Sequence, residues 1–237
     1  MLFGLIDLWG ARVRTEILAI AAVMACVPAC AQADLLVVRS AGVLASRIRA
    51  GTNLPDNAVV KLQQGDFLAL LDNRGIRELR GPAIVNLAEA SAPSKPISLF
   101  DFEGGQRAVI AGSRAPKAPV NTITPTASFV QCVIDGWQTY LVRADSLVAY
   151  QVKSASGGPD AMVQFDEYDR RVKWPSGLAL RNGLNSFRIR DAKSGAESSI
   201  GLRVVPSVPV SNMAYAATLI ANGCDEQLLE SMEKHAD

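Results

Sequence analysis

Apolar and polar positions alternate with a period of two along much of this chain, which is typical of β-strands that bury one face. Strict alternation at residues 59–62 predicts a half-buried strand, and the apolar, β-branched run at 35–40 predicts another. Residues 184–191 and 198–206 alternate on either side of a turn at 192–197, so they predict a hairpin with one face in water. The predicted fold class is therefore mainly β.

A second hairpin is predicted where the apolar run 67–71 meets the charged run 76–80 across a four-residue loop. Gly75 suits a positive φ in this loop, because glycine has no Cβ to clash with the backbone. The side chain of Asp72 or of Asn73 is expected to accept hydrogen bonds from the loop backbone.

Helical signals replace the alternation near the C-terminus. Ser211 is a predicted N-cap, and Gly223 is expected just past the end of the first helix. The predicted buried stripe of this helical segment consists of Leu219, Ile220, Leu228 and Met232.

The spacing of turn residues between Gly51 and Ala83 resembles that of the FecR-type periplasmic domain. The matching features are Gly51, Gly65-Asp66, the hairpin glycine Gly75, and a Leu-x-Gly-Pro segment that ends at Gly81-Pro82. The proline also ends strand pairing, because it has no N–H to donate. The resemblance implies a small all-β domain that acts in signalling or partner binding outside the cytoplasmic membrane.

Two segments of the second half, residues 171–191 and 218–232, resemble those of uncharacterised exported proteins of alphaproteobacteria. Those proteins couple a FecR-like domain to a C-terminal β-region. The resemblance implies an architecture and a compartment, and it implies no known activity.

The N-terminus predicts a secretory signal peptide over residues 1–33. Two arginines precede an uncharged apolar run at 17–27, and small residues at 31–33 predict cleavage near Ala33. The run is too short to span a bilayer, which takes about 20 residues. The apolar residues ahead of it leave two alternatives open, a wrongly assigned start at Met1 or a longer membrane-associated anchor. The chain is therefore expected to be periplasmic or secreted.

The four cysteines divide between the signal peptide and the mature chain. Lipidation of Cys26 or Cys30 is an alternative export route and would add a lipid anchor. The mature chain keeps Cys132 and Cys224, and an even pair in an exported protein favours one disulfide. Two buried free thiols are the alternative.

The composition also indicates domain boundaries. Residues 91–123 are rich in Pro, Ser and Ala, which predicts a linker with a short local strand or helix inside it. We therefore expect a FecR-like β-domain at 34–90 and a β-sandwich-like domain with a C-terminal helix at 124–237.

Charge and histidine content exclude several classes of function. The formal net charge is +1, so the phosphate neutralisation that nucleic-acid binding needs is lacking. The single histidine, His235, lies near the C-terminus, which disfavours Ser-His-Asp catalysis and the usual zinc sites. Residues 156–158 predict a turn rather than a phosphate loop, because no helix follows them. No catalytic residue, cofactor or metal is expected.

Aromatic side chains of the second half are the candidate contact residues. Trp174, Trp137 and Tyr168 would suit a peptide or glycan if they shared a face, and core packing is the alternative. The leading hypothesis is a non-catalytic periplasmic binding or signalling module that recognises a protein partner or an envelope ligand.

Two other classes of function stay open. An envelope enzyme acting on glycan or peptide would have to use carboxylates, since an internal histidine is lacking; the candidates are Asp135, Asp166, Glu167 and Asp169. The third class is a structural component of a cell-envelope assembly.

Overall fold

The computed structural model describes residues 35–72, 75–89, 99, 101–102, 119–143, 149–166, 169–208 and 210–234. All of them belong to one compact unit. The predicted signal peptide, with Cys26 and Cys30, lies outside these ranges. None of the described helices has the length and apolar character needed to cross a membrane.

The first part of the structure contains two small sheets. The larger has the strand order β2-β1-β4-β5, and the smaller pairs β3 with β6. The elements are β1 (Leu35–Ala41), a 3₁₀ helix (Val43–Ser46), β2 (Asn53–Leu54), β3 (Val59–Leu62), β4 (Phe67–Asp72), β5 (Gly75–Arg80) and β6 (Ala83–Asn86). The alternation predicted for residues 59–62 is confirmed, because Val60 and Leu62 are buried while Val59 and Lys61 are exposed.

Strands β1 and β4 are buried on both faces, which explains why their sequences are nearly continuous apolar runs. One face, with Leu35, Val37, Leu68 and Leu70, packs against the β3–β6 pair. The opposite face packs against the C-terminal helices and contributes Leu36, Val38, Ala69 and Leu71 to their core. A strand with two buried faces needs apolar residues at every position.

The predicted hairpin between β4 and β5 is confirmed, with a shorter connection than expected. The strands extend to Asp72 and Gly75, which pair with each other. Gly75 has a φ of 139°, and its N–H donates to Asp72 Oδ1 at 2.9 Å. The antiparallel pairing of β4 with β5 therefore includes Asp72 and Gly75, which were predicted to belong to the loop.

The Gly65-Asp66 step has a structural role. Asp66 is buried, and its Oδ2 accepts a hydrogen bond from Gln63 N at 2.7 Å while its Oδ1 accepts from Leu44 N at 3.0 Å. The carboxylate thus joins the turn before β4 to the 3₁₀ helix. Gly81 lies against the same turn, and its N–H donates to Asp66 O at 3.0 Å.

The second part forms two further sheets, with the orders β13-β10-β8-β7 and β12-β11-β14-β15-β9. The strands are β7 (Asp101–Phe102), β8 (Pro119–Ile123), β9 (Val130–Ile134), β10 (Gln138–Val142), β11 (Ala149–Ser154), β12 (Asp160–Gln164), β13 (Arg171–Lys173), β14 (Gly183–Asp191) and β15 (Glu197–Val205). The β14–β15 hairpin agrees with the predicted one to within one residue at each strand end.

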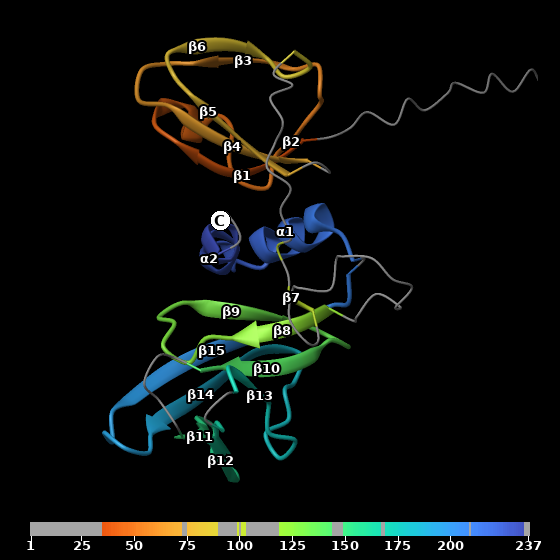
Figure 1. Cartoon of the computed structure of the whole chain (residues 1–237). Coiled ribbons are helices and arrows are strands. Elements are labelled where there is room, and N and C mark those ends of the chain that lie inside the picture. Colours follow the sequence, from red (N-terminus) through yellow and green to blue (C-terminus); the bar gives the residue numbers. More distant parts are fainter. Residues whose placement is uncertain are drawn as a thin grey trace, which may run out of the picture. The chain divides into compact units, whose positions relative to one another are not determined.

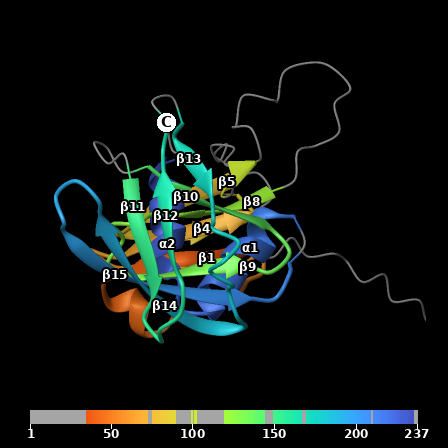
Figure 2. The same ribbon diagram turned by 90° about the horizontal axis from the view of Figure 1, so that it is seen from below.

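These two sheets enclose a shared core, as the predicted sandwich-like arrangement requires. Ile123 and Leu141 reach it from one sheet, and Val152, Phe187 and Leu202 reach it from the other. The β11–β12 hairpin lies far from the helices in Figure 1 and faces the viewer in Figure 2.

Two strands fall within the range for which the sequence predicted a linker. β7 and β8 lie between residues 91 and 123, and β8 pairs in parallel with β10. β8 begins at Pro119, and Pro125 lies two residues past its end, so the proline-rich composition concealed a paired strand.

Two helices, α1 (Asn212–Ala221) and α2 (Asp225–Lys234), complete the fold. The predicted N-cap is confirmed, because Ser211 accepts a hydrogen bond from Ala214 N at 3.1 Å. Gly223 follows α1 with a φ of 68°. The helices lie between the β1–β4 strands and β9 (Figure 1), and they bury Leu219 and Leu228 in the core between them. The other predicted stripe residues, Ile220 and Met232, are half-buried and pack against the same core.

Candidate functional site

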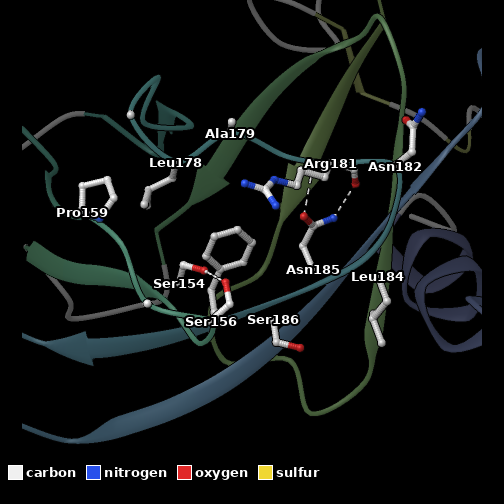
Figure 3. A pocket seen from close by; sticks show the side chains of 13 residues that line it. Ser154, Ser156, Pro159, Leu178, Ala179, Arg181, Asn182, Leu184, Asn185 and Ser186 are labelled. Carbon is white, nitrogen blue, oxygen red and sulfur yellow. Dashed lines mark hydrogen bonds between the residues drawn. The ribbon is translucent and has the colours of Figure 1, made fainter.

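A pocket of about 480 Å³ opens between the β11–β12 turn and the segment that leads into β14 (Figure 3). It combines hydroxyl groups and one guanidinium with a small apolar floor. Its lining residues are Ser154, Ser156, Gly157, Pro159, Gly177, Leu178, Ala179, Arg181, Asn182, Leu184, Asn185, Ser186 and Phe187.

The floor of the pocket rests on a tryptophan. Leu178 and Phe187 are only 4% and 3% exposed. Trp174 lies behind them: its Nε1–H donates to Leu178 O at 2.6 Å, and its ring meets the Phe187 ring edge-on with centroids 4.9 Å apart. Trp174 therefore fixes both floor residues without itself lining the pocket.

One wall carries Arg181, and Asn185 holds the backbone of that wall. Arg181 N donates to Asn185 Oδ1 at 3.0 Å, while Asn185 Nδ2 donates to Arg181 O at 2.7 Å and to Gly183 O at 3.0 Å. Gly183 has a φ of 88°, which an L-residue adopts with strain. The backbone under Arg181 is thus held by side-chain hydrogen bonds as well as by turn geometry.

The opposite wall is the turn between β11 and β12. The Oγ atoms of Ser154 and Ser156 are 2.9 Å apart. Gly157 N donates to Ser154 O at 3.2 Å, and Ala155 N donates to Ser186 O at 2.9 Å, which ties the turn to β14. The turn predicted for residues 156–158 is therefore confirmed, and it supplies two hydroxyl groups to the pocket.

The described lining groups offer hydrogen bonds and one positive charge. Arg181 is the one charged side chain among the described residues that line the pocket, and those residues include no carboxylate, imidazole or thiol. General acid–base catalysis uses groups of that kind. Within the described ranges, no three His, Cys, Asp or Glu side chains lie close enough together to hold a metal ion.

The two tryptophans among the predicted contact aromatics are not brought together. Trp137 stacks on Tyr215 at a centroid distance of 5.8 Å and packs against the helical core. Trp174 packs against the core between the two sheets of the second part. Tyr168 lies outside the described residues. Both tryptophans are half-buried, and they support different cores rather than one surface.

The predicted disulfide between Cys132 and Cys224 is confirmed. Its Cα atoms are 5.9 Å apart, and both residues are buried. It joins β9 to the connection between α1 and α2, and so ties the helices to the second part of the fold.

Three of the candidate carboxylates, Asp135, Asp166 and Asp169, lie on exposed segments. Asp135 follows β9, while Asp166 and Asp169 follow β12. All three side chains are exposed, and Glu167 lies outside the described residues. None of the three described carboxylates lines the pocket described above.

Sequence reasoning missed Arg181, Ser154 and Asn185. The Asn182-Gly183 dipeptide is a turn signal that marked the loop. No sequence pattern near residue 181 indicates that this loop lies beside the β11–β12 turn, because the two segments are brought together only by the pairing of β11 with β14.

Comparisons with known proteins add no relative: no family model matches the sequence, and neither a curated protein nor a solved structure does.

Proposed function

We propose that this protein is a non-catalytic recognition module of the cell envelope that binds a protein partner or an envelope ligand in the pocket between the β11–β12 turn and the segment before β14. The carrying observation is that both walls of this pocket are held in place before any ligand arrives. A site whose backbone is already ordered loses less conformational entropy on binding. The described lining residues offer hydrogen bonds and one positive charge, and they include no acid–base pair.

The disulfide supports an extracytoplasmic location. Disulfides persist in oxidising compartments and are rare in the cytosol. The Cys132–Cys224 bond joins elements 92 residues apart, so it contributes to the fold as a whole. This agrees with the signal peptide expected from the N-terminal sequence.

The resemblance of residues 51–83 to FecR-type domains supports a role in signalling or partner binding. In this proposal the first part of the fold positions the protein within the envelope, and the second part contains the binding pocket. The two parts are linked through the core around α1 and α2.

Site-specific photo-crosslinking in cells tests the proposal. A benzophenone amino acid replaces Ser156, an exposed residue of the pocket wall, or Ser199, an exposed residue of β15 outside the pocket. We expect a discrete adduct from position 156 and none from position 199. The added substitution Ala179→Trp, which fills the pocket from an exposed position, is expected to abolish the adduct.

Equal adducts at both positions, or none at either, would contradict the proposal. Mass spectrometry of the adduct from position 156 identifies the partner.

A further inference from the structure

We infer that the pocket recognises a carboxylate joined to a small apolar body, such as the last residue of a peptide chain. This inference rests on the proposed function and names the ligand chemistry of the same site. Arg181 and the Ser154–Ser156 pair reach into the depression from its two walls (Figure 3), and they are the groups that would bind the anion.

The charge of the lining selects an anion. Arg181 supplies a positive charge, and no negative side chain is present among the described lining residues to neutralise it. A guanidinium presents paired N–H donors whose spacing matches the two oxygens of a carboxylate. One cation suits one negative charge, whereas a polyphosphate or nucleic acid is held by several.

The hydroxyl pair supplies further donors. Ser154 Oγ and Ser156 Oγ are 2.9 Å apart, and either one can donate to the other. A hydroxyl rotates freely about its C–O bond, so both can turn to donate to a carboxylate oxygen when a ligand enters.

The floor and rim favour an apolar body over a sugar. Phe187 is 3% exposed, which leaves too little ring face for a sugar to stack on. Pro159 and Ala179 line the pocket, are exposed, and offer contact to an aliphatic side chain. Burial of such a side chain adds about 25 cal/mol per Å² of apolar surface removed from water.

Both halves of the anion site are positioned in advance. Asn185 fixes the backbone at Arg181, and the bond from Ala155 N to Ser186 O fixes the serine turn against β14. The two halves come from segments about 25 positions apart in the chain, and the β11–β14 pairing brings them together.

The test is a titration of the purified, disulfide-bonded chain with acetyl-Ala-Ala-Leu, followed by ¹⁵N NMR. We expect saturable shifts at the amides of Ser154, Ser156 and Arg181. The same peptide with an amidated C-terminus is expected to bind about tenfold more weakly or worse, because a charge-assisted hydrogen bond is lost.

Arg181→Gln should weaken binding of the free acid to a similar extent. Arg188→Gln, at an exposed arginine of β14 outside the pocket, should leave it unchanged.

A third ligand, 4-methylpentanoate, separates the two sources of this chemistry. Binding as tight as that of the peptide assigns the site to small free acids, and tighter binding of the peptide assigns it to polypeptide C-termini. Either result supports carboxylate recognition. Equal binding of the acid and amide peptides would overturn it, as would an Arg181→Gln variant that binds as well as the unaltered chain.

The outcome is distinguishable from that of the proposed function. If no carboxylate binds while crosslinking at position 156 gives its adduct, the ligand chemistry is wrong and the recognition module stands. If both experiments are negative, both proposals fail.

Discussion

Gln227 of α2 holds the backbone of Cys132 of β9 through two hydrogen bonds. Its Oε1 accepts from Cys132 N at 2.6 Å, and its Nε2 donates to Cys132 O at 3.2 Å. Asn121 makes the same pair of bonds to Ile134 two residues further along, at 2.8 and 3.0 Å. β9 is the edge strand of the five-stranded sheet. Two carboxamides therefore take the place of a neighbouring strand, and this edge is closed to strand addition by a partner.

Replacing Gln227 with alanine is expected to destabilise the protein by about 2 kcal/mol or more, because it leaves a buried N–H and a buried C=O without their partner. Guanidinium denaturation measures the change in the free energy of unfolding. Gln164→Ala, at an exposed position on β12, is the matched control and should stay within about 0.5 kcal/mol of the unaltered chain. Equal effects of the two variants would show that the carboxamide does not support β9.

Removing the disulfide should have a larger effect. Cys132 and Cys224 are 92 residues apart, and the chain-entropy model assigns about 4–5 kcal/mol to closing a loop of that length. We expect the double variant Cys132→Ala/Cys224→Ala to lose about that much stability in the same assay. A loss below about 1 kcal/mol would mean that residual structure in the unfolded chain keeps residues 132 and 224 close together without the bond.

Gly81 is predicted to resist substitution because of its neighbour rather than its φ. A Cβ at this position would lie 1.8 Å from Gln63 O and 2.7 Å from Gln63 C, so the backbone would have to move. We expect Gly81→Ala to lower stability by about 1–3 kcal/mol, the usual range for overpacking. At Gly177 a Cβ would meet nothing within 4 Å, so Gly177→Ala should be neutral or slightly stabilising. Thermal melting of both variants makes the comparison.

The local parts of the fold were predictable from the sequence. Both hairpins, the Ser211 cap and the Gly223 stop each depend on residues within a few positions of one another, and propensity and periodicity report such interactions. The continuous apolar run of β4 was identified as a strand, although its burial on both faces depends on helices more than 130 residues later in the chain.

The candidate site was not predictable in the same way. Trp174 was selected as a contact residue, and it lies directly beneath the pocket floor. Arg181 and Ser154 carry no signal of their own, because only the pairing of β11 with β14 brings them together. The parallel pairing of β9 with β15 was equally hidden, since parallel neighbours are joined by long connections.

Asp66 gives the first part of the fold a dependence on pH. The hydrogen bond from Gln63 N, and then that from Leu44 N, stabilise the charged carboxylate and lower the pKa of Asp66 below its ordinary value of 3.8. The unfolded chain takes up the proton at the ordinary pKa, so it binds more protons than the folded chain as the solution is acidified. The stability from this group is therefore present above pH 3.8 and is lost as the pH falls through the lower folded-state pKa.

Asp66→Asn should be less stable than the unaltered chain at neutral pH, because an amide has one acceptor oxygen for two N–H donors. Its stability should also decline less steeply between about pH 5 and pH 2, since the titrating group is gone. Some decline will remain, because the hydrogen bond from the Ser194 hydroxyl lowers the pKa of Asp191 in the same direction. Urea midpoints measured across this range compare the two chains, with Asp191→Asn as the second reference. Parallel curves for Asp66→Asn and the unaltered chain would show that the carboxylate at position 66 has the same pKa in the folded and unfolded states.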